Sequence, residues 1–109
     1  MSLLSSVRNS RNSKLFFSKE ELTQILQCYS IGVSKGNWKD YAILFENKKA
    51  SFYMFKHTLA HPDCILTKIK KNKKKSIIYN LKFSNKKNKN FNKMNDLIAI
   101  LKRQEFQII

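Results

Sequence analysis

The sequence predicts a single α+β domain, with an N-terminal helix, a four-stranded antiparallel sheet and a C-terminal helix packed on one face of that sheet. Three observations predict it. Apolar residues recur at helical spacing near both ends of the chain, and four strand-like segments lie between them. Hydrophobic residues fill 42% of the 109 positions, which argues against a disordered chain and allows one modest core.

The first predicted helix begins after Ser18 with a capping box. In this motif the Ser18 hydroxyl accepts a hydrogen bond from the Glu21 amide, and the Glu21 carboxylate accepts one from the Ser18 amide. Phe17 and Leu22 stand at the positions of a hydrophobic staple across the cap. Gly36 is placed to end the helix. Between these signals runs an apolar stripe at helical spacing: Leu22, Ile25, Leu26, Tyr29 and Val33.

Four segments have the composition of strands: residues 38–45, 50–56, 65–69 and 76–83. The polar residues 46–49 fit a hairpin turn, and residues 72–75 make the next turn. The last two segments alternate in polarity, as expected of an antiparallel sheet with one solvated face. One face of the last segment carries Ile77, Tyr79, Leu81 and Phe83.

The C-terminal part of the chain predicts a solvated loop and then a short helix. Residues 84–93 are rich in Lys and Asn and are interpreted as the loop. Met94, Leu97, Ile98 and Leu101 give the helix its apolar face, and the apolar residues from 106 to 109 are expected to dock on the core. We therefore assign residues 1–15 to a flexible basic tail, with a transit peptide as the alternative, and residues 16–109 to the domain.

Positive charge is concentrated in the second half of the chain. From residue 63 onward there are thirteen bases and three acids, so this part carries +10 of the net +15. A field of this strength attracts anions, and nucleic acid, acidic membrane surfaces and other polyanions are the usual candidates. The leading hypothesis is therefore a non-catalytic module that binds RNA or DNA. The candidate nucleic-acid-binding residues are Lys68, Lys70, Lys71, Lys73, Lys74, Lys75, Lys86, Lys87 and Lys89.

The same charge has a compositional explanation. The bases comprise nineteen lysines and only three arginines, and asparagine occurs eleven times. Lysine, asparagine and isoleucine share A- and T-rich codons, so a genome that drifts toward A and T would be enriched in all three. Arginine is the residue expected where bidentate recognition of phosphate matters. The sequence leaves open whether the lysine excess is functional or compositional.

Protein interaction is the alternative function. A partner would meet a sheet edge or the segment Trp38, Lys39, Asp40 and Tyr41, although Trp38 packing on the first helix is the simpler interpretation. Aromatic residues on a sheet can also stack on bases, with Tyr53, Phe55 and Tyr79 as candidates. Lysines that converge on one face would favour nucleic acid, whereas dispersed lysines with an exposed apolar patch would favour a protein partner.

Catalysis and metal binding are not expected. His57, His61, Asp63 and Cys64 crowd one loop, and Cys28 could join them, but the spacing of a zinc finger or knuckle is missing. The seven carboxylates are scattered, and two glycines cannot make a phosphate-cradling loop. We therefore predict no catalytic residues, no metal, no cofactor and no small-molecule substrate.

No segment predicts a membrane span, because the longest apolar runs, residues 41–45 and 97–101, have five residues each. The two cysteines lie outside any CxxC pattern, so neither a secreted, disulfide-stapled fold nor a redox motif is indicated. A cytoplasmic protein is the expectation.

Several stretches resemble a known family. They are residues 22–29, Gly36-Asn37-Trp38-Lys39-Asp40-Tyr41-Ala42, residues 52–56, Ile69-Lys70-Lys71 and residues 97–101. Over roughly residues 15–104 the chain resembles an alphaproteobacterial family known as domain of unknown function 2794. The resemblance implies a bacterial cytoplasmic protein and brings no established activity or catalytic residues. The chain departs from the family pattern in a longer connection at 61–69 and in the Lys/Asn-rich stretch 84–93.

Overall fold

The computed structural model describes residues 14–57, 61–71, 76–84 and 86–108, with side chains described up to residue 103. Along the chain the elements are α1 (Lys19–Ser34), β1 (Asp40–Phe45), β2 (Lys49–Phe55), β3 (Cys64–Lys70), β4 (Ile77–Phe83), β5 (Lys89–Phe91) and α2 (Met94–Ile108). None of the helices in this part of the chain is long and apolar enough to cross a membrane. Most of the tail predicted for residues 1–15 lies outside the described residues.

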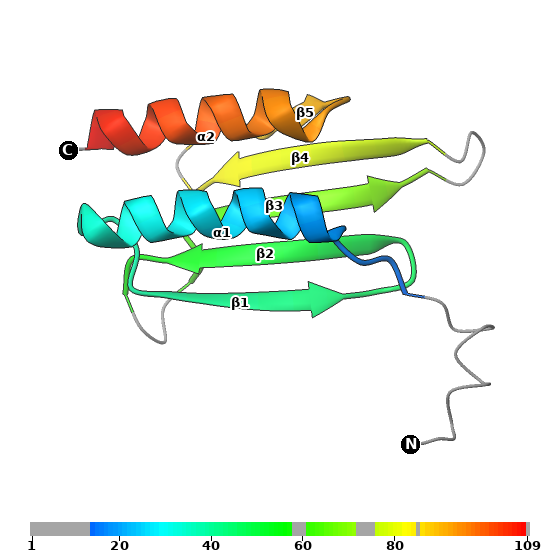
Figure 1. Ribbon diagram of the computed structural model, residues 1–109, viewed down its shortest axis with the longest axis horizontal. Coiled ribbons are helices and arrows are strands. Elements are labelled where there is room, and N and C mark those ends of the chain that lie inside the picture. The colour runs from blue at the N-terminus through cyan, green and yellow to red at the C-terminus, as the bar shows by residue number, and fades with distance from the viewer. Residues whose placement is uncertain (1–13, 58–60, 72–75, 85, 109) are drawn as a thin grey trace, which may run out of the picture.

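The strands form one antiparallel sheet in the order β1-β2-β3-β4-β5, and both helices cover the same face of it (Figure 1). Each strand therefore pairs with its neighbours in sequence. The predicted α+β class and the two helices are confirmed. The predicted number of strands is wrong, because the sheet has five strands and not four.

The fifth strand lies inside the stretch 84–93, which the sequence predicts to be a solvated loop. β5 pairs with β4, and Asn90 stands opposite Asn80. The Asn80 side-chain Nδ2 donates to Asn90 Oδ1 at 2.8 Å. Phe91 stands opposite Tyr79 and packs against the core. Pairing with β4 thus orders a segment whose composition alone indicates a loop.

The predicted capping box of α1 is confirmed. The Glu21 amide donates to Ser18 Oγ at 3.1 Å, and the Ser18 amide donates to Glu21 Oε1 at 2.8 Å. Phe17 is buried, as the hydrophobic staple predicts, and Leu22 packs on the core. At the other end the helix stops at Ser34, and Gly36 takes the left-handed conformation (φ 83°) that the sequence predicts.

α2 is longer than the apolar pattern predicts. Its face toward the sheet carries Met94, Leu97, Ile98 and Leu101, all buried. The backbone stays helical to Ile108, so most of the predicted apolar tail belongs to the helix. The docking predicted for its side chains lies outside the described residues.

The two faces of the sheet differ in what covers them. Met54, Cys64 and Leu66 point to the side of the helices and form the centre of the core with Trp38 and Phe52. Directly opposed residues in an antiparallel sheet share a face, and successive residues alternate. The other face, which no described element covers, carries the intervening residues: Asp40, Ala42, Leu44, Lys49, Ser51, Tyr53, Phe55, Ile65, Thr67, Ile69, Ile78, Asn80, Lys82 and Asn90. We call it the helix-free face.

Candidate functional site

Lys68, the first of the predicted nucleic-acid-binding lysines, is engaged inside the fold. Its ammonium donates to Glu21 Oε1 at 2.9 Å and to the Phe16 carbonyl at 2.9 Å. Glu21 Oε2 accepts a short hydrogen bond from the Tyr79 hydroxyl. The Lys68 and Glu21 side chains are only 11% and 13% exposed. Lys68 therefore ties β3 to α1 and does not present a surface cation to phosphate.

The pKa values of this cluster follow from its contacts. Burial raises the pKa of the Glu21 carboxyl, but the hydrogen bonds from Lys68, Tyr79 and Ser18 outweigh burial and leave the pKa below its usual value. Burial, and then the hydrogen bond to Glu21, raise the pKa of Tyr79 above its ordinary range. Both shifts favour the ionised Glu21 and the neutral Tyr79 in the folded state.

The other predicted lysines do not form one surface. Lys70 and Lys71 lie where β3 ends, whereas Lys86 and Lys87 follow β4 at the opposite end of the sheet (Figure 1). A seven-residue strand such as β4 separates these ends by about 20 Å. Lys73, Lys74 and Lys75 lie outside the described residues. The described residues between 68 and 93 therefore do not form one continuous basic surface.

One end of the sheet gathers lysines from distant parts of the sequence. The Lys70 amide donates to the Lys48 carbonyl at 2.9 Å, so the β1–β2 turn lies beside the end of β3. We call Lys48, Lys49, Lys70 and Lys71 the turn-end cluster. Glu46 reaches Lys49 only at 3.9 Å, and both side chains are largely exposed. Lys48 and Lys49 are not among the predicted binding residues, although a meander places alternate turns at the same end of a sheet.

At the opposite end, three of the predicted lysines surround a small cavity of about 220 Å³. Its apolar lining comes from Leu81, Phe83 and Ile100, and its charged lining comes from Lys86, Lys87 and Lys89. These lysines therefore lie on the helix side of β4 and at its far end from the turn-end cluster. One ligand bound flat on the sheet would not contact both groups.

The helix-free face carries two of the three predicted stacking aromatics. Tyr53 stands between Ala42 and Ile65 on neighbouring strands, and Phe55 stands opposite Asp40. Both rings are partly exposed. Tyr79, the third candidate, is 9% exposed and bonded to Glu21 on the helix side, so it does not share this surface.

A row of polar side chains crosses the helix-free face beside these rings. Ser51, Thr67, Asn80 and Asn90 stand opposite one another on four successive strands. Flanking positions carry exposed Lys82 and the aliphatic Ile65, Ile69 and Ile78. The face is thus less polar than the sequence predicts, and it carries aromatic, amide and hydroxyl groups together.

The predicted partner-contact segment divides between core and surface. Trp38 is 1% exposed, in agreement with the simpler interpretation, so its side chain is not accessible to another molecule. Lys39 and Asp40 are exposed, and Asp40 Oδ1 accepts the Tyr41 amide at 2.8 Å. The Tyr41 ring, 42% exposed, stacks on Phe52 with ring centroids 5.0 Å apart.

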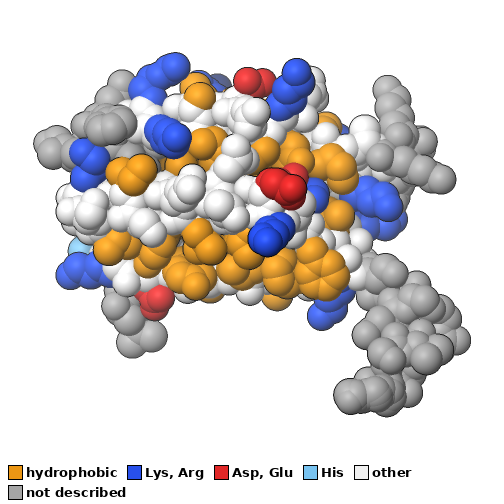
Figure 2. Space-filling model, viewed as in Figure 1, with side chains coloured by type: hydrophobic (Ala, Val, Ile, Leu, Met, Phe, Trp, Pro, Cys, Tyr) orange, Lys and Arg blue, Asp and Glu red, His pale blue; other side chains and the backbone are white. Residues whose placement is uncertain are grey.

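An exposed apolar strip follows the β1 edge of the sheet. Among the described residues, five large hydrophobic side chains are exposed, and three of them, Phe16, Tyr41 and Leu44, lie on or beside β1. Figure 2 shows hydrophobic side chains running along the lower margin, where β1 lies in Figure 1. Among the described strands, β1 has a partner on one side only, so its other edge has no strand beside it. Just past this strand, the Leu15 amide donates to the Glu46 carbonyl at 2.7 Å.

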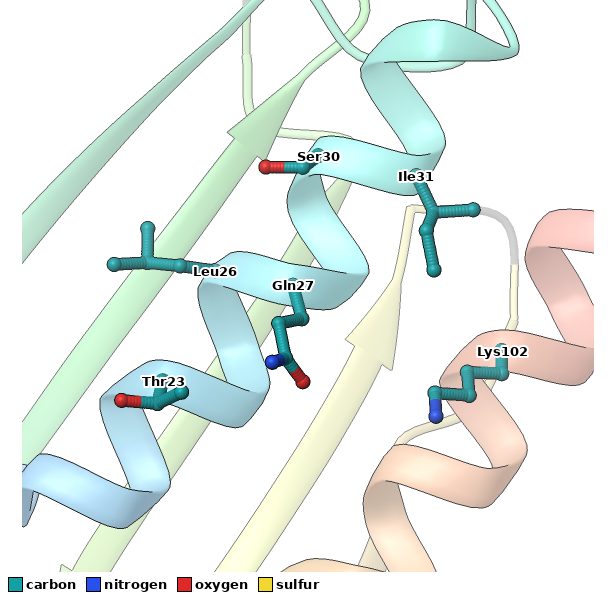
Figure 3. A pocket seen from close by; sticks show the side chains of 6 residues that line it. All are labelled: Thr23, Leu26, Gln27, Ser30, Ile31 and Lys102. Atoms are coloured by element: carbon teal, nitrogen blue, oxygen red, sulfur yellow. The ribbon is translucent and has the colours of Figure 1, made fainter.

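A larger, open groove of about 520 Å³ lies between the helices (Figure 3). Lys102 of α2 extends toward α1 across it. The α1 wall is formed by Thr23, Leu26, Gln27, Ser30 and Ile31. The lining contains one charged side chain and no acid–base pair, so its chemistry does not indicate a catalytic site.

The residues considered for a metal do not converge. His57 and His61 are exposed, whereas Cys64 is fully buried on the helix side of β3. The Asp63 carboxylate accepts the Lys56 amide at 2.7 Å. Neither Cys28 nor Cys64 forms a disulfide. Within the described ranges, no group of three or more His, Cys, Asp or Glu side chains could hold a metal ion.

A family model described as "Protein of unknown function (DUF2794)" matches residues 15–105. The chain belongs to this family. The match covers every described strand and α1, together with most of α2, so the DUF2794 region includes the helix-free face, the turn-end cluster and the β1 edge. No curated protein and no solved structure matches the chain. The family description assigns no activity.

Proposed function

We propose that this DUF2794 protein is a non-catalytic module that binds single-stranded nucleic acid on its helix-free face. One observation carries the proposal: this face presents the partly exposed rings of Tyr53 and Phe55 on a sheet that ends at the turn-end cluster. A sheet with exposed aromatics can stack unpaired bases. Counted along β2, Lys49 of the turn-end cluster lies about 13 Å from Tyr53 and about 20 Å from Phe55, so a bound strand would run along β2 to bring its phosphates to these lysines.

The composition of the face supports a single strand over a duplex. Each base in a single strand exposes its ring faces, and stacking on an aromatic side chain contributes about 1–3 kcal/mol per base. Bases inside a duplex are stacked on each other and cannot reach Tyr53 or Phe55. The amides of Asn80 and Asn90 are in reach of base edges on the same surface.

The lysines of the turn-end cluster support contacts that are independent of base sequence. Lysine is a compact point charge, whereas arginine is the residue that reads phosphate or guanine with two parallel bonds. Lys48, Lys49, Lys70 and Lys71 are all exposed at one end of the sheet. We therefore propose affinity for the backbone with little base preference.

The proposed absence of catalysis rests on how the carboxylates and thiols are used. Glu21, Asp40 and Asp63 each accept a backbone amide, and Glu46 is exposed beside Lys49. Cys28 and Cys64 are fully buried. A nucleophile beside a histidine, the arrangement that covalent catalysis needs, does not occur among these described groups.

Fluorescence anisotropy with a labelled oligonucleotide, titrated over a range of salt, tests the proposal. Four lysine–phosphate contacts predict a logarithmic salt slope of about −3 for a single strand. Replacing Lys48, Lys49, Lys70 and Lys71 with Gln should remove most of this slope. The matched control replaces Lys86, Lys87 and Lys89 with Gln at the opposite end and should leave it nearly unchanged.

Aromatic substitutions test the stacking part separately. Tyr53→Leu or Phe55→Leu should weaken binding by about 1–3 kcal/mol, that is, roughly 5- to 150-fold. Ile65→Val, on the same face but without a ring, should have little effect. Tighter binding of duplex than of single strands, or full affinity after loss of the turn-end cluster, would contradict the proposal.

Protein interaction along β1 is the second candidate function, and the exposed apolar strip favours it. Apolar side chains that gather beside an open strand edge are typical of surfaces that meet another chain. Apart from Lys68, the described lysines of the predicted nucleic-acid site lie at two ends of the sheet and not on one face, which leaves the β1 edge available to such a contact.

A further inference from the structure

We propose that the open edge of β1 pairs with the same edge of a second copy of this chain, joining the two sheets about a twofold axis at Ile43. This inference rests on the second candidate function, in which β1 meets a protein. It does not depend on nucleic-acid binding.

The hydrogen-bond register of β1 determines which backbone groups face outward. The Glu46 amide donates to the Lys49 carbonyl at 2.8 Å and closes a two-residue turn. Residues 40, 42 and 44 therefore direct their amides and carbonyls toward β2, because bonded pairs alternate along an antiparallel ladder. Tyr41, Ile43 and Phe45 direct theirs to the open edge, where the Tyr41 amide already donates to Asp40 Oδ1 at 2.8 Å.

These three positions are self-complementary. With Ile43 opposite the partner's Ile43, Tyr41 faces the partner's Phe45 and the outward backbone groups of each strand meet those of the other. On the helix-free face, the small Ala42 stands opposite the partner's Leu44. Leu44 is 47% exposed in the single chain, so this pairing covers one of its most exposed apolar side chains.

β1 lacks several of the features that usually prevent edge pairing. Natural edge strands carry lysine or proline, or are very short, whereas the six residues of β1 contain neither lysine nor proline. In a chain of net charge +15, residues 40–46 hold two acids and no base. Two copies therefore repel each other less at this edge than at the lysine-bearing ends of the sheet.

A second copy fits this edge because antiparallel pairing of one strand with itself closes a twofold dimer, the commonest form of protein assembly. Two features oppose it. The Tyr41 amide would have to exchange its bond to Asp40 Oδ1 for one to the partner's Phe45 carbonyl. Asp40 stands opposite the partner's Glu46 in this register, and like charges directly opposite are unfavourable. Asp40→Asn should therefore tighten the dimer, because it removes this repulsion and weakens the acceptor that holds the Tyr41 amide.

Sedimentation of nuclease-treated protein at several concentrations and two salt concentrations tests the pairing. We expect a dimer that is tighter in 1 M than in 0.1 M salt, because the Debye length shortens from about 10 Å to about 3 Å and repulsion between the basic copies weakens. Salt acts in the opposite direction on nucleic-acid binding, so the two processes are distinguishable.

Leu44→Lys should raise the dimer dissociation constant about tenfold, because two symmetric Leu44 contacts are lost and charge is added to the edge. Ile31→Lys is the matched control. Ile31 is also exposed, at 37%, but lies in the groove between the helices, so this change should leave association unaltered.

Crosslinking checks the register. Two Ile43→Cys chains should form an intermolecular disulfide, since Cα atoms of a bonded antiparallel pair lie about 5.5 Å apart. Leu44→Cys chains should not, because residue 44 is offset diagonally from its own copy by about 7–8 Å. The native Cys28 and Cys64 are fully buried and should not compete.

A parent protein that stays monomeric up to about 1 mM at both salt concentrations would overturn the inference. So would a dimer that Leu44→Lys does not weaken, or one that crosslinks through position 44 and not 43. If a monomeric parent retained another protein and lost it on Leu44→Lys, self-pairing would be overturned while the general protein-contact function stood.

Discussion

Glu21→Gln should destabilise the domain far more than its place in a helix cap suggests. The cap alone accounts for one contact, the Ser18 amide donating to Glu21 Oε1. The same carboxylate also accepts from Lys68 and Tyr79, so it holds α1 to β3 and β4. The amide of glutamine keeps the shape but loses the charge, which leaves the Lys68 ammonium, 11% exposed, without its counterion.

The expected loss is about 2–3 kcal/mol. Removing one partner of a buried ion pair costs about 3–5 kcal/mol. This pair is slightly exposed, so the loss of stability on removing Glu21 should be at or below the lower end of that range. For a domain of this size, each kcal/mol lowers the melting temperature by roughly 4–8 °C, so a fall of about 10 °C or more is expected. Glu46→Gln is the matched control, because the exposed pair of Glu46 with Lys49 contributes less than about 1 kcal/mol.

Thermal and urea unfolding of parent, Glu21→Gln, Lys68→Met and the double variant measure this effect. The double variant should be less destabilised than the sum of the single variants, since the two residues interact directly. The folded-state pKa of Glu21 lies below its unfolded value of about 4.5, so its contribution is present above that pH and is lost as pH falls through the folded pKa. Glu21→Gln should flatten this acid dependence. Equal melting temperatures for Glu21→Gln and Glu46→Gln would refute the reasoning.

Three further predictions concern stability. Ser18→Ala should cost about 0.5–2 kcal/mol in chemical unfolding, because the Glu21 amide loses its acceptor; coincident melts would show that the cap contributes nothing. Tyr79→Phe should make stability less sensitive to alkali. The folded-state pKa of Tyr79 is raised, so the parent loses stability as pH rises above the unfolded value of about 10, and the variant lacks that loss. Gly36→Ala should cost about 1 kcal/mol from backbone strain alone, since φ is 83° and nothing lies within 4 Å of an added Cβ; an unchanged melt would contradict this.

Local signals in the sequence were sufficient for the helices and for four of the strands. The Ser18–Glu21 capping box, the apolar stripe and Gly36 are short-range features, and the structure reproduces each of them. Alternation of side chains likewise located β3 and β4 within one or two residues. Patterns that one element can satisfy by itself are the ones that sequence reasoning recovers.

Long-range pairing could not be predicted in the same way. β5 has only three residues, and a side-chain hydrogen bond from Asn80 on β4 holds its Asn90 in place. Lysine is usually found at the surface, so the sequence gives no sign that Lys68 is mostly buried. Its ion pair with Glu21, 47 residues earlier, depends on the fold. Composition reports that such groups exist, whereas the tertiary structure decides which of them meet.

The candidate site shows the same division. The lysine-rich half of the chain was recognisable from charge alone, but the fold sends Lys70 and Lys86 to opposite ends of the sheet. Lys48 joins Lys70 through a backbone bond between two turns that lie far apart in sequence. Tyr53 and Phe55 were recognised as candidates, and the register places both on the helix-free face.

The most direct test of the central claim is to map which amides respond when an unlabelled single-stranded oligonucleotide is added to isotopically labelled protein. We expect chemical-shift changes at Tyr53, Phe55 and Asn80 on the helix-free face and at the turn-end cluster, with residues 86–89 and α2 unaffected. Shifts confined to residues 86–89, or none at oligonucleotide concentrations that saturate other single-strand-binding modules, would contradict the account.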